Sequence, residues 1–203
     1  MRQPGLLEVP KVRFYEPERN LPGRRLRSAT AETQFTIQFA RAYLSQQIAL
    51  HHRTDKLDSA CARQVPINGF GIADLVTVAW KQPVDNRQPV TADDFIQRTH
   101  PTVRAFEVKL NSWRRGMAQA HRYRYFASVA ILVLPAEKCE SAVPYLDTFR
   151  RIRVGLWGFD PGSNRIIVHY TPRPSAALEP KYQTRAVELV ARASRALPVL
   201  RKL

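Results

Sequence analysis

The sequence predicts an α/β domain in which helices flank a central mixed sheet. Three apolar runs of strand length, at residues 71–80, 103–110 and 128–134, alternate with longer segments whose apolar residues recur at helical spacing. A chain of 203 residues suffices for one domain with a buried core. We therefore expect a single domain at residues 30–203, preceded by an arm at residues 1–29.

The arm contains four prolines and seven basic residues and has no apolar period. This composition is typical of an extended segment that becomes ordered only against a partner. Thr30 then has the character of a helix N-cap, and apolar residues from Phe35 to Ile48 predict a helix from residue 30 to about Leu50. The polar residues 51–62 are expected to form a loop with a ragged helical end.

The rest of the chain predicts strands and helices in alternation. In order these are strands at 63–68, 71–80 and 103–110, a helix from Asn111 or Ser112 through Tyr123, a strand at 128–134, a helix at 137–150, strands at 153–159 and 165–170, and a helix from Glu179-Pro180 to about Leu197. Residues 81–102 contain three prolines and are expected as an insertion. Within it, Thr91 before Asp93 and Asp94 predicts a capped short helix rather than a metal site.

Three charged residues lie on two of the predicted strands. Glu107 and Lys109 belong to one apolar run and Asp74 to another. Residues i and i+2 of a strand project from one face, so Glu107 and Lys109 point together while Val108 turns into the core. Two carboxylates bind a hard divalent cation, and an ammonium can orient water or stabilise charge on a phosphate. Taken singly, these residues could instead form structural ion pairs.

The order Gly71-x-x-Asp74, Glu107-x-Lys109 and Gln119-x-x-x-Tyr123 resembles the PD-(D/E)xK nuclease superfamily, particularly its RecB-like and restriction-endonuclease-like members. The resemblance covers about residues 30–135. It implies a restriction-endonuclease-like α-β-β-β-α-β core, to which this chain adds a C-terminal hairpin and helix at residues 137–203. It also implies cleavage of nucleic acid with Mg²⁺ or Mn²⁺. Alanine rather than the family's proline precedes Asp74, at a position that contributes no ligand atom.

The resemblance also assigns roles to individual residues. Asp74, Glu107 and the Val108 carbonyl would coordinate the metal ion, and Lys109 would orient the attacking water or offset charge in the transition state. Many members complete the metal sphere with an acid on the first helix, where Glu32 lies. The positive end of the helix macrodipole explains a carboxylate at Glu32 equally well.

The helix after the Glu-x-Lys triplet is rich in polar and basic residues. Gln119 and Tyr123 are four residues apart and share one face, which the resemblance places beside the active site. Basic residues on this helix are expected to contact the sugar-phosphate backbone, with a solvated helix face as the alternative. They are Arg114, Arg115, His121 and Arg122.

The composition favours a polyanionic partner. A net charge of +15 and a pI near 10.6 attract nucleic acid, which we expect to be DNA rather than RNA. The prediction is a metal-dependent endonuclease, acting as a homodimer or within a larger complex for defence, transposition or repair. Two alternatives stay open: a nucleic-acid-binding protein on a nuclease fold that does not cleave, and a basic adaptor for another protein.

The chain gives no signal for a membrane. Its longest apolar run, near residues 126–134, is too short to span a bilayer, and the N-terminus lacks the apolar core of a signal peptide. Only Cys61 and Cys139 are present, without metal-ligand spacing. A reducing, cytoplasmic location is therefore expected.

Overall fold

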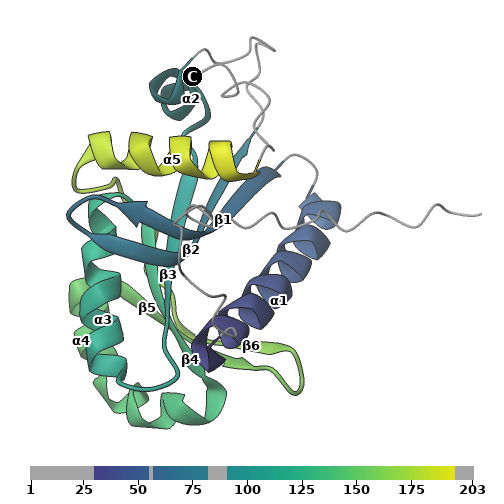
Figure 1. Cartoon of the computed structure of the whole chain (residues 1–203), viewed down its shortest axis with the longest axis vertical. Coiled ribbons are helices and arrows are strands. Elements are labelled where there is room, and N and C mark those ends of the chain that lie inside the picture. The colour runs from purple at the N-terminus through teal and green to yellow at the C-terminus, as the bar shows by residue number, and fades with distance from the viewer. Residues whose placement is uncertain (1–29, 55–56, 82–90, 195–203) are drawn as a thin grey trace, which may run out of the picture.

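The computed structural model describes residues 30–54, 57–81 and 91–194 (Figure 1). The predicted arm, residues 82–90 of the predicted insertion and the chain beyond Ser194 lie outside the described residues. The elements, in order, are α1 (Ala31–Thr54), β1 (Leu57–Ile67), β2 (Gly71–Lys81), α2 (Ala92–Thr99), β3 (Thr102–Val108), α3 (Trp113–Arg122), η1 (Tyr123–Tyr125), β4 (Val129–Pro135), η2 (Ala136–Ser141), η3 (Val143–Tyr145), α4 (Leu146–Ile152), β5 (Val154–Asp160), β6 (Arg165–Tyr170) and α5 (Pro180–Ser194).

The strands form one six-stranded mixed sheet in the order β1-β2-β3-β4-β5-β6. β1, β2 and β3 are antiparallel neighbours, β3, β4 and β5 are parallel, and β6 returns antiparallel to β5. Helices flank this sheet, with α1 against one face and α3 and α4 against the other (Figure 1). The predicted α/β class with a central mixed sheet is confirmed.

The ragged helical end predicted at the start of residues 51–62 is confirmed, but the loop predicted for the rest of the described segment was wrong. α1 continues to Thr54, and β1 begins at Leu57 and pairs with β2 along its whole length, from Leu57↔Lys81 to Ile67↔Gly71. The buried residues in the first half of β1 include Ala60 and Ala62, whose small side chains pack in the cluster that also holds α5. Small residues give a weak apolar period, so only the second half of the strand, near residues 63–68, was predicted.

The single helix predicted at 137–150 was also wrong. Two short 3₁₀ turns, η2 and η3, precede the regular helix α4, which begins only at Leu146. Pro144 lies in the second turn, and a proline has no backbone N–H to donate to a preceding turn. A continuous helix is therefore interrupted there. The strand predicted to reach residue 110 ends at Val108, although the Lys109 N–H still donates to the Val133 carbonyl at 3.0 Å.

The other predicted elements are confirmed to within a few residues. Thr30 caps α1, with its Oγ1 3.2 Å from the Thr33 N–H, and Thr91 caps α2 through the Asp94 N–H at 3.1 Å. Asp93 accepts a hydrogen bond from Thr184 at 2.6 Å. The predicted cap of α2 is therefore present at Thr91, whereas the Asp93 side chain contacts α5. In the described part of the chain, no helix is long and apolar enough to cross a bilayer.

α3 and α4 lie side by side and run in the same direction. Each crosses between two parallel strands, α3 from β3 to β4 and α4 from β4 to β5, over the same face of the sheet. Near their starts, the Trp113 ring lies 4.9 Å from Tyr145 and 6.0 Å from Phe149. Near their ends, Arg124 donates to the Ile152 carbonyl at 3.3 Å. Both helices, which carry many of the basic residues, thus cover the same face of the sheet.

Candidate functional site

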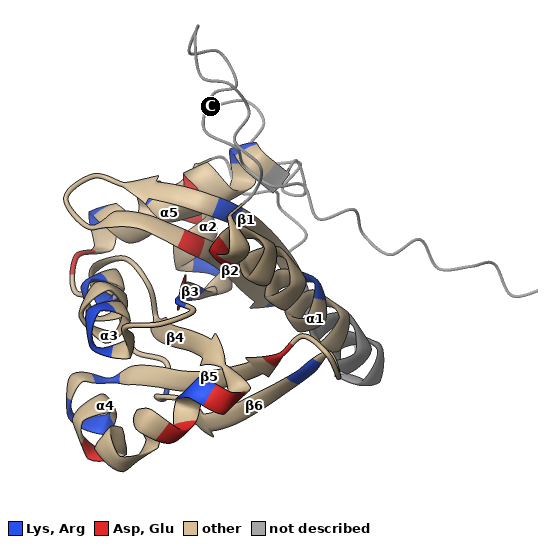
Figure 2. Cartoon of the chain, turned by 60° about the horizontal axis from the view of Figure 1, so that its bottom comes forward, with Lys and Arg blue, Asp and Glu red and all other residues tan. Residues whose placement is uncertain are grey.

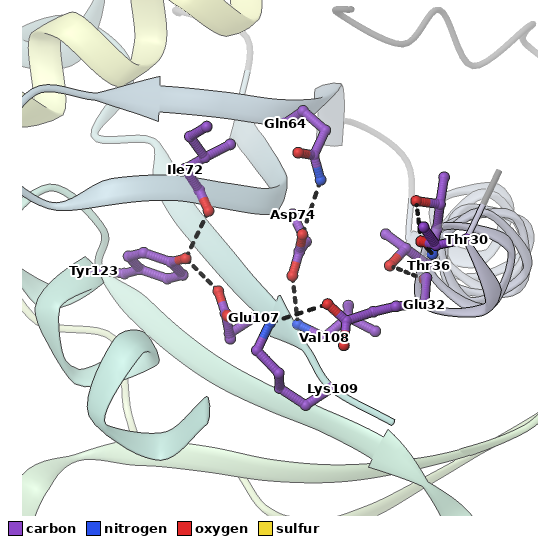
Figure 3. Close-up of polar contacts among 11 residues, drawn as sticks. Thr30, Glu32, Thr36, Gln64, Ile72, Asp74, Glu107, Val108, Lys109 and Tyr123 are labelled. Carbon is purple, nitrogen blue, oxygen red and sulfur yellow. Dashed lines mark hydrogen bonds and ion pairs between the residues drawn. The ribbon is translucent and has the colours of Figure 1, made fainter. Parts of the chain in front are cut away.

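Three polar residues lie in one row across adjacent strands. The register pairs Leu75 with Phe106 on β2 and β3, and Arg63 with Leu75 on β1 and β2. One residue further along, Asp74 therefore stands opposite Glu107 on one side and opposite Gln64 on the other. Their neighbours Leu75 and Phe106 are fully buried on the other face, against α1. The row thus faces α3 (Figure 3).

Asp74 lies where the backbone hydrogen bonds between β2 and β3 end. Its Oδ2 accepts the Val108 N–H at 2.8 Å, and its Oδ1 accepts Nε2 of Gln64 at 2.8 Å. The carboxylate therefore accepts the hydrogen bond that the Val108 N–H of β3 would otherwise donate to a backbone carbonyl. Burial first, and then the charge of Glu107, raise the pKa of Asp74 to about 6.

Glu107 is the most deeply buried acid of the site, at 1% exposure. Its Oε1 lies 2.9 Å from the Lys109 ammonium, and its Oε2 accepts a hydrogen bond from the Tyr123 hydroxyl. The Tyr123 hydroxyl also lies 2.9 Å from the Ile72 carbonyl, so its single hydrogen is shared between two acceptors. Burial, followed by the charge of Glu107, raises the pKa of Tyr123, which keeps this side chain a neutral donor.

Lys109 connects the row to α1. Its Nζ lies 3.2 Å from Oε1 of Glu32, in addition to its ion pair with Glu107 (Figure 3). Burial opposes the charge of Lys109, but the hydrogen bond and charge of Glu107, then Asp74 and Glu32, outweigh burial and raise its pKa. Lys109 is thus an ammonium at neutral pH. Glu32, from the first turn of α1, reaches the site through this ammonium.

The cluster has an excess of negative charge. Asp74, Glu107 and Glu32 carry three negative charges when ionised, and Lys109 supplies one positive charge, which leaves −2. Two of the acids, Asp74 and Glu107, are directly opposed on neighbouring strands. Buried like charges are costly unless a counter-charge is present. The cluster therefore has the charge that a divalent cation neutralises.

Gln64 is a site residue that sequence reasoning missed. It has φ = 52° in the middle of β1, a left-handed conformation that is unfavourable for a residue with a Cβ. From this position its amide donates to Asp74. Strained residues of this kind gather at functional sites. A glutamine inside a strand pattern carries no sequence signal for a positive φ, so the register was needed to find it.

A polar cavity adjoins the row. It has a volume of about 440 Å³ and is lined by Glu32, Lys109, Leu110, Asn111, Ser112, Arg115 and Gln119. Within the described residues, Oε1 of Gln119 is buried and has no hydrogen-bond partner. A buried amide oxygen is rarely left without a partner. The cavity therefore offers an unfilled acceptor beside the Lys109 ammonium.

Gly116 allows α3 to approach the site closely. A Cβ at this position would lie 2.6 Å from Cδ1 of Leu132 and 2.9 Å from Cγ of Lys109. Leu132 is the neighbour of Glu107 on β4. Glycine in a helix lowers its stability relative to alanine, so its presence here is explained by the close contact. The stem of Lys109 is thereby held against α3.

The structure brings most of the predicted site residues together. Glu107, Lys109, Glu32 and Tyr123 share direct contacts, and Gln119 and Arg115 line the adjoining cavity. Asp74 lies opposite Glu107 and accepts the Val108 N–H. Three predicted side chains lie outside this group. Arg114 stacks over Trp113 at 4.4 Å, Arg122 is exposed at the end of α3, and His121 has a lowered pKa because of burial and then the charge of Arg124.

The donors that a metal ion could use are two carboxylates rather than a larger cluster. Over the three described stretches of the chain, no group of three or more His, Cys, Asp and Glu side chains is arranged to hold a metal ion. Asp74 and Glu107 offer hard oxygen donors on adjacent strands, and Mg²⁺ commonly binds one or two carboxylates and keeps several waters. The residues present therefore fit such an ion. A role for the Val108 carbonyl stays a prediction.

No protein-family model matches this chain, and neither a curated protein nor a solved structure is detectably similar to it.

Proposed function

We propose that this chain is a metal-dependent nuclease of the PD-(D/E)xK type that hydrolyses phosphodiester bonds, with DNA as the preferred substrate over RNA. One observation carries the proposal. Asp74 and Glu107 face each other on neighbouring strands, and Lys109 is the cation that contacts Glu107. A net charge of −2 in this cluster suits a divalent ion and is poorly suited to a purely structural ion pair.

Mg²⁺ or Mn²⁺ bound between Asp74 and Glu107 would supply Lewis acidity toward the scissile phosphate and the attacking water. The chain's own residues orient that centre. Gln64 and the Val108 N–H hold the two oxygens of Asp74, and Tyr123 holds Oε2 of Glu107. Side chains held by such contacts require little reorganisation when a substrate binds.

Lys109 has the position and charge for the second part of the chemistry. Its ammonium lies at the boundary between Glu107 and the polar cavity. Because its pKa is raised, it stays protonated and can donate to a water or to a phosphate oxygen. Gln119 and Arg115, which line the same cavity, can contact the phosphate on the other side.

The order of elements supports the same proposal. The first part of the chain runs α1-β1-β2-α2-β3-α3-β4, which, apart from the short helix α2 in the predicted insertion, follows the α-β-β-β-α-β order that the sequence resemblance implies. Asp74 comes from β2, Glu107 from β3 with Lys109 just after it, Gln119 from α3, and Tyr123 from η1 directly after α3. The hairpin of β5 and β6 and the helix α5 are additions beyond that order.

A second candidate function is nucleic-acid binding without cleavage. The observation that favours it is the complete pairing of Glu107, whose two oxygens contact Lys109 and Tyr123. A carboxylate engaged in this way can serve the structure without any ion. The two candidates differ in whether a divalent ion changes what the protein does to its ligand.

Cleavage of labelled DNA and RNA, with Mg²⁺, Mn²⁺ or EDTA, tests the proposal. Asp74→Ala, Glu107→Gln and Lys109→Met are each expected to abolish cleavage nearly completely, while binding in EDTA is retained. Glu188→Gln, at a carboxylate on α5 that pairs with Arg185, is the matched control and should cleave normally. Full activity in Asp74→Ala, or metal-independent cleavage, would overturn the proposal. Binding without cleavage by the wild type would favour the second candidate.

A further inference from the structure

The positive charge of the described residues is concentrated on α3 and α4 and on the residues that directly follow each helix. Residues 113–124 contain four arginines and no acid, and residues 146–153 contain three arginines and one aspartate, which gives a net charge of +6. α1, on the opposite face of the sheet, has a net charge of only +1 from two arginines and one glutamate. Figure 2 shows the corresponding blue segments on the neighbouring helices α3 and α4.

Most of these arginines are available to a ligand. We call the exposed set the arginine surface; it consists of Arg114, Arg115, Arg122, Arg150, Arg151 and Arg153. Arg150 forms an ion pair with Asp147 at 2.7 Å. For the other five, no ion pair with a carboxylate occurs within the described part of the chain. Uncompensated charge at this density is unfavourable unless a polyanion covers it.

One arginine of this surface is held in place by aromatic rings. The Arg114 guanidinium lies 4.4 Å from the Trp113 ring and 5.1 Å from the Tyr145 ring, and its Nη2 donates to the Tyr145 hydroxyl at 3.2 Å. Tyr145 is 43% exposed between the two helices. A guanidinium fixed in this way loses little freedom when it binds a phosphate.

The surface is continuous with the candidate site. Arg115 belongs to it and also lines the cavity beside Lys109. The surface also includes Arg151 and Arg150 on α4, the helix that contacts α3 through Trp113 and Phe149, and the Arg150 guanidinium lies 6.0 Å from the Tyr170 ring of β6. A ligand whose reacting group lies at Lys109 can therefore continue over α4.

We infer that the arginine surface binds the phosphate backbones of both strands of a nucleic-acid duplex, so that a double-stranded segment lies across α3 and α4 next to the cleavage site. α3 crosses between β3 and β4 and α4 between β4 and β5, so the two helices present two separate rows of arginines. A duplex likewise presents two rows of phosphates, one on each side of a groove that is about 12 Å wide for the major groove of B-form DNA. Two rows of arginines on parallel helices match two strands, whereas a single strand presents one row of phosphates.

This inference takes its ligand class from the proposed function, but it is tested by binding alone. The alternative role of these arginines is structural. Arg122, Arg150 and Arg151 lie in the last turns of their helices, where cations interact favourably with the helix dipole. That role would affect stability and leave binding unchanged.

The experiment measures binding of a short DNA duplex and of one of its strands by fluorescence anisotropy in EDTA, over a series of salt concentrations. The test variant is Arg150→Gln/Arg151→Gln. The matched control is Arg41→Gln/Arg192→Gln, which removes equal charge from α1 and from the last turn of α5. Melting curves confirm that both variants are folded.

For the duplex, the test variant is expected to flatten the slope of log K against log salt by roughly 1.8, at about 0.9 per phosphate contact. That corresponds to a loss of affinity of up to about 60-fold at 0.1 M salt if counterion release is the main effect. The control variant should keep the wild-type slope, and the single strand should lose less affinity than the duplex.

Two results would overturn the inference: a slope equal to that of the control, or equal losses for duplex and single strand. A different result would show that the proposed nuclease function is wrong while the binding inference holds. In that case the wild type would not cleave with Mg²⁺ or Mn²⁺, while the duplex-binding defect of the α4 variant would remain.

Discussion

The helices α1 and α3 cover opposite faces of the same strand, β3, and pack against it in different ways. α1 uses aromatic rings: Phe39 lies 5.4 Å from Phe106 and 5.7 Å from Phe159, centroid to centroid. α3 uses small residues, Gly116 and Ala120, and leaves a polar cavity beside Glu107 and Lys109. The α1 face thus provides packing energy, which allows the α3 face to hold buried charges that are costly by themselves.

The strongest test of this difference is Phe39→Ala on the α1 face. Phe39 is fully buried among aromatic rings, and its truncation leaves a cavity. We expect the free energy of unfolding to fall by about 3–5 kcal/mol, measured by urea denaturation. Cleavage per folded molecule should be unchanged below the transition. A strong loss of cleavage by a fully folded variant would show that the α1 face also shapes the site.

On the α3 face, Gly116→Ala should affect function more than stability. The added methyl group overlaps Leu132 and the stem of Lys109. Overpacking costs about 1–3 kcal/mol, and the better helix propensity of alanine returns roughly 1 kcal/mol. We expect a small change in melting temperature and a clear decrease in the rate of cleavage, because Lys109 is displaced. Ala118→Gly, at an exposed position of α3, is the control for helix propensity alone.

Two variants of Gln64 distinguish the effect of its backbone strain from the effect of its contact with Asp74. Gln64→Gly removes the amide and relieves the positive φ, whereas Gln64→Ala removes the amide and keeps the strain. The glycine variant should therefore be more stable than the alanine variant by about 1 kcal/mol. Both should need more Mg²⁺ for half-maximal cleavage, because Asp74 loses one donor. Wild-type Mg²⁺ dependence in both variants would mean that Gln64 has no role at the metal site.

Glu32 is expected to have the smallest effect on stability. It is half-exposed and pairs with Lys109, and Thr30 already caps α1. Glu32→Gln should raise the Mg²⁺ concentration needed for cleavage and leave the melting temperature nearly unchanged. If Glu32 serves only the helix dipole, the variant should lose about 0.3–1 kcal/mol of stability and cleave with the wild-type Mg²⁺ dependence.

The chemistry-bearing residues could be predicted because a strand fixes the direction of its side chains. The spacing of Glu107 and Lys109 was enough to place both on one face, and the contact between them bears this out. Helical spacing predicted that Gln119 and Tyr123 share one face, and the resemblance implied that this face lies beside the site. Tyr123 does contact Glu107, although it lies just beyond α3 in η1. What the residues do together stays a proposal.

The parts that were missed depend on long-range packing. The first half of β1 is a strand because it pairs with β2. Its buried alanines are too small to give a clear alternation of apolar and polar residues in the sequence. The positive φ of Gln64 arises at a position opposite Asp74, which no local pattern indicates. Pro144 was a local signal, and it accounts for the break before α4 that the predicted helix overlooked.

The metal-free stability should also depend on pH through Asp74. Its pKa is raised in the folded protein from 3.8 to about 6, so the folded state binds the proton more tightly than the unfolded state. The contribution of Asp74 to stability is therefore fully present below about pH 4 and is lost as pH rises through 6. A divalent ion competes with that proton, so the rise in melting temperature on adding Mn²⁺ should be larger at pH 7.5 than at pH 5.

Calorimetric titration of Mn²⁺ into the wild type and Asp74→Ala tests the central claim most directly, because it measures the metal site without requiring cleavage. The wild type is expected to bind Mn²⁺ at pH 7.5, to bind it more weakly as the pH falls through about 6, and to lose this binding event in Asp74→Ala. Absence of binding by the folded wild type, or identical binding by Asp74→Ala, would contradict a metal site at Asp74 and Glu107.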